Sequence, residues 1–523
     1  MKLQRIARLS VVGIGCVAGS AAAQKPVQVK PVAPQPEVKH HEPPRVDGGA
    51  TVVEVPDFRG QFGPDRQPQG GFSLQDQLET YRKAPVATQE PFYLWGREMY
   101  ASGPLREYPN VFGNMNPTQP HLMVYGDART AVGFSDNGDI ERAPLATRLN
   151  VDFDLKLTAT ERVHAFVRPF DKNGRIMSAD IGGEDGNEDE FVLDGNLDTL
   201  FFEGDIGPIV QGASGRPNNL DLPIAFGKMP LLFQNGVWLE DAFTGVATTI
   251  QAKNSGVLDI ANADFTFFAG FDDVSSAAVK DAKLRGGQTP SEGGTKIVGV
   301  AGFVETREGY AEFGLGITQA EEVNGAAEDD ADYLNVTAAW TKRYWHWLSN
   351  SVRVISNVGQ DLEGSETADG VLLLVENSFG TKQPYTLIPY FNLFVGMNSP
   401  QSLARAADAG GVLKNTGINF ETDGLTGHPK LDDTGHDAWG AALGVEYLPN
   451  LFTAAHRQQI VLELAGLHPF GDDATAQGDE FAFGARYQFV IDNSWILRAD
   501  AMLGWREEDD ELAGFRVEIR KKF

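Results

Sequence analysis

The sequence predicts an all-β fold, a transmembrane antiparallel β-barrel of about 18 strands, with a range of about 16–18. Three observations predict it. Polar and apolar residues alternate over most of residues 119–523, and the chain is rich in glycine, with 58, and in phenylalanine, with 32. After the amino terminus, no apolar run reaches the ~20 residues that a membrane-spanning helix needs.

The alternation is clearest over residues 148–157, where five polar residues alternate with five apolar ones. Residues 333–341, 481–489 and 495–505 repeat this pattern of period two, which indicates strands with one polar and one apolar face. Counted this way, strands are expected to begin near residues 121, 145, 161, 196, 222, 242, 263, 295, 308, 332, 350, 370, 384, 437, 457, 480, 494 and 513.

Strands can cross lipid only as a closed barrel, because every backbone donor and acceptor must be paired inside the protein. Short periplasmic turns are expected to alternate with longer external loops. Residues 171–174 and 492–493 are predicted short links, and residues 398–433 are the longest predicted loop. No helices are expected between the strands, and both chain ends are expected on the periplasmic side.

The amino terminus predicts export. Lys2, Arg5 and Arg8 precede a short apolar stretch, and the small residues Ala21 to Ala23 suit cleavage before Gln24. The domains are therefore predicted as a signal peptide over 1–23, a Pro-rich periplasmic tether over 24–56, an irregular periplasmic or plug segment over 57–118, and the barrel over 119–523. The single cysteine, Cys16, lies in the signal peptide.

The formal charge of −28 argues against nucleic acid as a partner. Acidic stretches such as 183–190 and 328–330 are typical of solvated loops. They would favour cations if they capped a pore, although solubility explains them as well.

Motifs for catalysis and cofactors are absent from the sequence. It contains no Gly-x-Ser-x-Gly elbow, no His-Glu-x-x-His pair and no phosphate-binding loop, so no enzyme activity is predicted. Residues 194–198 resemble the start of a calcium loop, but Thr199 stands where that loop needs glycine, and an acidic turn explains them better. No cofactor and no metal site are predicted.

The candidate functional residues are charges on the polar faces of the expected strands, which would face the lumen. They either line a permeation path or pair across it to stiffen the wall. The predicted pore-lining residues are Arg129, Arg148, Asp152, Asp154, Lys156, Arg162, His164, Arg168, Arg353, Arg486, Arg498, Asp500, Arg516 and Glu518. Those from residues 129–168 would form a basic ladder on one wall, facing carboxylates such as Asp127 and Glu463.

The last strand carries a resemblance to a known class. Phe515, Val517, Ile519 and Phe523 share one face, and the chain ends on an aromatic carboxyl terminus. This resembles the closing strand of Gram-negative outer-membrane barrels. The resemblance implies an outer-membrane location, contact with the lipid bilayer and lipopolysaccharide, recognition of this strand by the barrel-assembly machinery, and a possible homo-trimer. Lys521 departs from the strictest pattern, but its stem could reach the membrane interface.

A second resemblance lies in residues 225–233 and 240–246, with a Gly-Lys-x-Pro core at Gly227 and a Phe-x-Gly-Val segment at Phe243. This is similar to a hairpin of alginate-export-type barrels and phosphate-selective porins. It implies a large outer-membrane channel, and no site residues transfer from it.

Two functions follow from these features. The first is a porin-like channel for passive diffusion of small polar or charged solutes, constricted by an inward-folded loop, with 398–433 the longest candidate, or by residues 57–118. The alternative is a plugged scaffold or conduit barrel that serves a periplasmic or surface partner in polymer export or electron transfer.

Overall fold

A computed structural model gives the fold of one compact unit, residues 87–523. The residues that the structure describes are 91–96, 108, 110–138, 140–172, 175–182, 189–276, 295–320, 332–345, 347–360, 368–382, 386–422, 424–449, 457–470, 478–492, 494–508 and 510–523. The predicted signal peptide and tether, and most of the segment predicted as irregular, lie outside these residues.

Eighteen strands form the wall in the described part of the chain. They are β2 (His121–Asp136), β4 (Pro144–Lys156), β5 (Arg162–Val167), β8 (Leu197–Asp205), β9 (Pro223–Phe233), β10 (Leu239–Ser255), β11 (Ile260–Asp272), β12 (Thr295–Thr306), β13 (Gly309–Ala320), β14 (Tyr333–Tyr344), β15 (Leu348–Val358), β16 (Gly370–Phe379), β17 (Leu387–Asn398), β19 (Ala438–Tyr447), β20 (Gln458–Pro469), β21 (Glu480–Val490), β22 (Trp495–Arg506) and β23 (Leu512–Lys522).

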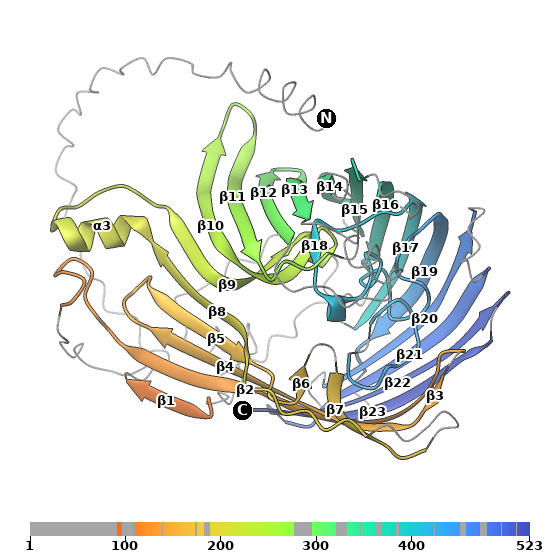
Figure 1. Ribbon diagram of the computed structural model, residues 1–523. Helices are drawn as coiled ribbons and strands as arrows, with labels where there is room; N and C mark the ends of the chain where they lie inside the picture. Colours follow the sequence, from red (N-terminus) through yellow and green to blue (C-terminus); the bar gives the residue numbers. More distant parts are fainter. Residues whose placement is uncertain are drawn as a thin grey trace, which may run out of the picture. The chain divides into compact units, whose positions relative to one another are not determined.

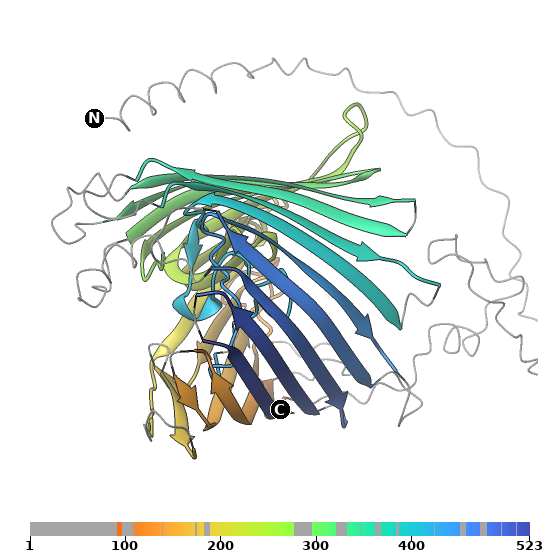
Figure 2. The same cartoon turned by 90° about the vertical axis from the view of Figure 1, so that its right-hand side faces the viewer.

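Each wall strand pairs antiparallel with its neighbour, and β23 pairs back onto β2, from Asp127 opposite Lys522 to Asp136 opposite Ala513. The wall is therefore a closed ring (Figure 1). The predicted antiparallel barrel of about 18 strands is confirmed, and the strands begin within a few residues of the expected positions. In the side view the strands run slanted and side by side (Figure 2), as closure of a barrel requires.

The two ends of the barrel differ. The turns at one end include the two residues between β12 and β13 and the three between β14 and β15. The other end carries the connections over 168–196, 273–294 and 399–437. This is the predicted asymmetry, with one difference. Asp171 and Lys172 were expected in a short periplasmic link, but they form β6 (Asp171–Lys172), which pairs with β7 (Arg175–Asp180) at the long-loop end.

One helix interrupts the pattern, contrary to the expectation of none. It is α3 (Ile206–Ser214), between β8 and β9 at the short-turn end. Asp205 caps its first turn by accepting a hydrogen bond from the amide of Gly207 at 2.7 Å, and Gly215 ends it in the left-handed conformation. No helix among the described residues is long and apolar enough to cross a membrane.

A short strand precedes the barrel. It is β1 (Tyr93–Gly96), which pairs antiparallel with the first four residues of β2. It continues the line of β23, because the backbone of Phe523 bonds to Gly126 in both directions and the Phe523 ring meets Phe92 edge-on at 5.9 Å. Part of the segment predicted as irregular is therefore joined to the closing seam of the barrel.

The register sorts side chains into an outer and an inner face. Phe134, Phe226, Leu443 and Trp505 are exposed on the outer face. Lys521 also lies on this face, where its ammonium group sits 4.8 Å from the centre of the Trp495 ring. At the short-turn end between β14 and β15, Trp345 and Trp347 stack at 5.6 Å and are exposed, which fits an interfacial belt rather than a buried corner.

The hydrophobic core lies inside the barrel, not between sheets. Residues 399–437, here called the lumen loop, leave the wall after β17 and fold inward, as the cyan segment at the centre of Figure 1 shows. The loop contains β18 (Ala404–Arg405) and the 3₁₀ turn η2 (Ala407–Ala409). Its Leu403, Leu413, Phe420 and Leu431 are fully buried against the inner wall. The remaining short elements are β3 (Glu141–Arg142) and the 3₁₀ turn η1 (Gln234–Gly236).

Candidate functional site: the barrel lumen

The register places thirteen of the fourteen predicted pore-lining residues on the inner face. In the strand register Arg129 is opposite Arg148, Asp154 is opposite His164, and Asp500 is opposite Arg516. All of them lie on the face that meets the lumen loop. Arg168 is the exception in position, since it follows β5 at the long-loop end. Their role in permeation remains a prediction.

The predicted basic ladder is present, but carboxylates are interleaved with it. Arg129 pairs with Asp127 at 2.9 Å, Arg148 with Asp171 at 2.6 Å, and Arg162 with Asp154 at 3.5 Å. Three arginines of the ladder are therefore in ion pairs. The pairs of Arg148 and Arg162 join β4 to β6 and to β5, so these two arginines bind neighbouring strands together.

His164 belongs to the same wall and has two kinds of neighbour. Its Nε2 lies 3.1 Å from the Glu203 carboxylate, and its ring stacks on Phe201 at 4.8 Å. Both neighbours come from β8, so this histidine joins β5 to β8 rather than standing free in the lumen.

Asp500 is the centre of the densest charge cluster. Its carboxylate accepts hydrogen bonds from Arg486 at 2.6 Å, Arg498 at 2.8 Å and Arg516 at 2.8 Å. The side chain is only 5% exposed, so these interactions are little screened by solvent. Arg498 and Arg516 lie close together because β22 pairs with β23, with Asp500 directly opposite Arg516.

The lumen loop adds a carboxylate to this cluster. Glu421 accepts from Arg486 at 2.6 Å and lies 3.3 Å from Arg498. Although its burial acts in the opposite direction, the attraction of Arg486 and Arg498 lowers the pKa of Glu421 below its ordinary value. The loop is thus fastened to β21 and β22 by charge.

A second fastening lies on β20. The buried carboxylate of Glu463 accepts from the backbone amides of Ile418 at 3.0 Å and Asn419 at 2.9 Å, and from the Tyr390 hydroxyl. Glu463 was expected to pair with a basic residue of the ladder. It instead binds the loop backbone, because two amide donors reach it there.

On the opposite side the loop joins the β9–β10 hairpin. Ala404 and Arg405 pair in parallel with Leu239 and Glu240. These two residues begin β10, before Thr244, where its pairing with β11 starts. The guanidinium of Arg405 donates to the carbonyl of Gly236 at 2.6 Å. The loop therefore crosses the lumen between walls that lie far apart around the ring.

The hairpin turn itself also points inward. The indole of Trp238, fully buried, donates to Asn335 on β14 at 2.8 Å, and Thr337 donates to Gln234 at 2.9 Å. Two segments from the long-loop end, the lumen loop and the β9–β10 turn, thus narrow the lumen. Of these two, the sequence predicted only the lumen loop.

Glycines on the inner face make room for these segments. A Cβ added at Gly316 would lie 2.5 Å from the Leu403 side chain, and one at Gly514 would overlap the ring of Pro429. Glycine at these wall positions is required by the close approach of the loop.

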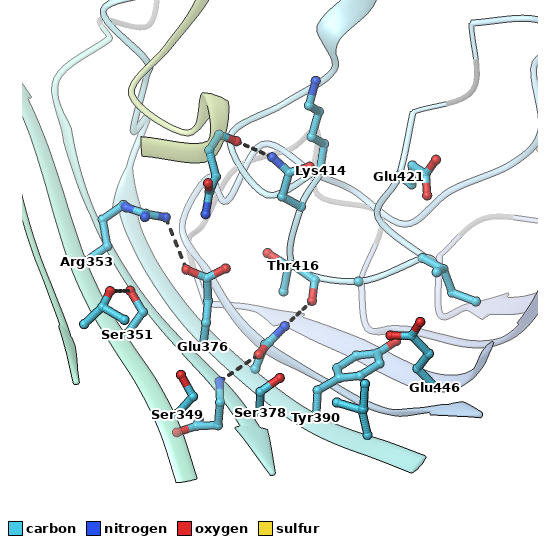
Figure 3. Close-up of a pocket in the computed structure, with 18 of the residues that line it drawn as sticks. Ser349, Ser351, Arg353, Glu376, Ser378, Tyr390, Lys414, Thr416, Glu421 and Glu446 are labelled. Carbon is cyan, nitrogen blue, oxygen red and sulfur yellow. Dashed lines mark hydrogen bonds and ion pairs between the residues drawn. The ribbon is translucent and has the colours of Figure 1, made fainter. Parts of the chain in front are cut away.

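A polar cavity of about 490 Å³ lies beneath the lumen loop, toward the short-turn end (Figure 3). Its wall comes from β13–β17, β19 and β20, and loop residues 414–418 and Glu421 complete it. Arg353, a predicted residue that is 1% exposed, lies here between Glu376 at 3.2 Å and Glu312 at 3.7 Å.

Sequence reasoning missed most of this cavity. Ser349, Ser378 and Tyr310 carry no charge, so a search for inward charges passed over them. The alternation of β15 and β16 does place Ser349 and Ser378 on the inner face, and that signal could have found them.

No protein-family model matches the sequence, and no curated protein matches it either. Solved structures do match. The chain is similar to Pseudomonas aeruginosa OpdK, solved with vanillate, at 11% identity and a TM-score of 0.51, over 77% of this chain and 98% of that one. It is also similar to Pseudomonas aeruginosa OccK3 (OpdO), at 9% identity and a TM-score of 0.47, over 76% and 95% of the two chains.

Pseudomonas aeruginosa OccK5 (OpdH) matches at 9% identity and a TM-score of 0.45, over 77% of this chain and 98% of that one. At such identities the likeness to OpdK bears on the fold alone. This chain has the fold of the outer-membrane porins, a closed antiparallel barrel of 18 strands in the described residues.

Proposed function

We propose that this protein is an outer-membrane, porin-like channel through which small polar or charged solutes diffuse passively. One observation carries the proposal: a closed barrel with an apolar outer face encloses a lumen of paired charges, narrowed by a loop that folds in from the long-loop end. Such a lumen offers a polar route across a layer that excludes polar solutes.

The membrane itself supplies the further partners. The outer face suits the lipid bilayer, with lipopolysaccharide at the long-loop end, and the terminal strand ending at Phe523 suits recognition by the barrel-assembly machinery. Assembly as a homo-trimer belongs to the same proposal. So does the kinship with alginate-export-type barrels and phosphate-selective porins that the β9–β10 hairpin suggests. No catalytic role is part of it, in keeping with the fold shared with OpdK.

A plugged scaffold is the second candidate. The observation that favours it is the burial of Leu413, Phe420 and Leu431 in the lumen, because a loop with its own hydrophobic core resembles a plug. In that case the barrel would serve a periplasmic or surface partner instead of a solute.

Conductance separates the two. The purified mature chain is inserted in a planar bilayer, and steady ohmic steps with a preference for K⁺ over Cl⁻ are expected for the channel. A chain that conducts only after residues 24–118 or the lumen loop are deleted would instead support the plugged scaffold. A protein that stays soluble in the periplasm without detergent would contradict both.

A further inference from the structure

The cavity beneath the lumen loop has the composition of a binding site for a neutral, hydroxyl-rich solute. At about 490 Å³ it lies within the ~300–1,000 Å³ typical of small-molecule sites. Half of its lining is hydroxyl or amide side chains, while the apolar lining is limited to Ile388, Ile418 and Val461. The hydroxyl and amide residues are Asn235, Tyr310, Thr341, Ser349, Ser351, Ser378, Tyr390, Asn392, Asn415 and Thr416.

The cations that line the cavity are already committed. Arg353 lies between Glu376 and Glu312, at 3.2 and 3.7 Å, and Lys414 pairs with Glu240. An entering carboxylate would therefore have to displace a protein carboxylate to gain a cation.

Carboxylates also outnumber cations in the lining. Glu376, Glu421 and Glu446 face the cavity, against Arg353 and Lys414. The local field thus opposes an anionic solute.

Two of the three carboxylates, Glu376 and Glu421, are already paired with arginines, which leaves Glu446 alone to attract a cationic solute. Glu421 accepts from Arg486 at 2.6 Å, and Glu446 accepts from Gln459 at 2.7 Å. What the cavity offers to a solute is therefore uncharged hydrogen-bonding capacity.

Several hydroxyl groups retain that capacity. The side chains of Ser349, Ser378 and Tyr310 form no hydrogen bond with any other described residue, and Ser378 and Tyr310 are exposed. The buried hydroxyl of Thr416, at the loop side of the cavity, also lacks a partner within the described part of the chain. Hydroxyls that both donate and accept match the hydroxyls of a sugar, and the exposed Tyr310 ring adds an apolar face for its C–H groups.

We propose that this cavity is a subsite for neutral polyhydroxylated solutes, of the chemistry of a monosaccharide, and that it selects them over hydroxylated acids. The inference rests on the proposed channel function, since the subsite would lie on the route of the solute. Ser349, Ser378 and Tyr310 would bind the solute, and the Arg353–Glu376 pair would hold β15 and β16 in place behind it.

The test uses three pyranose solutes of similar size that differ in charge: glucose, glucuronate and glucosamine at pH 6. Each is titrated against the KCl current of the full mature chain in a planar bilayer. Glucose is expected to block the current at the lowest concentration. Stronger block by glucuronate or by glucosamine would overturn the proposal, in favour of an anion or a cation site.

A double variant, Ser349→Ala with Ser378→Ala, removes two unpartnered hydroxyls. The half-blocking concentration of glucose is expected to rise about fivefold to a hundredfold, as the loss of two ordinary hydrogen bonds implies. The matched control is Ser356→Ala on the same strand, whose register partners Val336 and Val371 place it on the outer face.

Equal block in the double variant and the control would refute the subsite and leave the channel function intact. Absence of any KCl current from the unsubstituted chain would instead refute the channel function. The two failures are therefore distinguishable.

Discussion

Many charged residues of the lumen form ion pairs with one another and are largely buried. Asp500 shows this best, because three arginines from three adjacent strands share its carboxylate. Together with Glu421, this carboxylate offsets the charge of arginines that would otherwise repel one another inside a poorly solvated wall. The cluster stiffens β21–β23, and these strands include the closing one.

Asp500→Asn tests that role. The substitution leaves Arg486, Arg498 and Arg516 with fewer anions, so the free energy of unfolding should fall by about 3 kcal/mol, as when a buried pair is broken. Urea titration of the folded barrel, followed by the difference in gel migration between unheated and boiled samples, measures this. Asp152→Asn is the matched control, since Asp152 lies on the same inner face and forms no ion pair with the described residues. An equal decrease in the free energy of unfolding in both variants would show that the Asp500 cluster does not stabilise the barrel more than an unpaired carboxylate does.

The sequence predicts which residues face inward but not what they touch. Alternation with period two places Arg148, Asp500 and Arg516 correctly, since each side chain of a strand points opposite to the next. The partners depend on register and on a loop that has no periodicity, so Glu421 and the amides that bind Glu463 could not be predicted. The helix α3 was missed for a different reason, because its nine residues are too few for a long helical pattern.

Among the elements, the lumen loop has the largest effect on the barrel interior. It is held by β18 on one side and by Glu421 and Asn419 on the other. The wall strands accommodate it with inner-face glycines, so loop and wall constrain each other. A side chain added at such a glycine should disturb the loop more than the strand.

Gly514→Ala tests whether a side chain added at an inner-face glycine disturbs the lumen loop. The added methyl group would overlap the rigid ring of Pro429, so the loop must shift, and overpacking of this kind costs about 1–3 kcal/mol. The expected result is lower stability to urea and faster protease cleavage within residues 424–431. Gly133→Ala is the control, because it also faces the loop but its Cβ would come no nearer than 3.4 Å to any loop atom. Equal cleavage of the two variants would mean that loop position does not depend on this contact.

At the scale of the whole molecule, the barrel wall closes without any contribution from the lumen loop. The eighteen strands close through their own backbone pairing, from β2 round to β23, and β17 pairs with β19 directly, from Leu387 opposite Tyr447 to Gly396 opposite Ala438. The lumen loop thus connects two strands that are already adjacent. Neighbouring strands lie ~4.8 Å apart, a distance that a short turn can bridge.

Replacing residues 400–436 by a short Asn-Gly turn should therefore leave a folded barrel with a wider lumen. The variant loses the core around Leu413 and Phe420, so its stability to urea should decrease, yet the difference in gel migration between unheated and boiled samples should persist. Its single-channel conductance should increase several-fold over that of the intact chain, and the block by glucose should disappear, because the loop side of the polar cavity is gone. A folded variant with unchanged conductance would place the permeation route outside the space that the loop occupies. Conductance that appears only in this variant, and not in the intact chain, would instead support the plugged scaffold, because the loop would then be the plug.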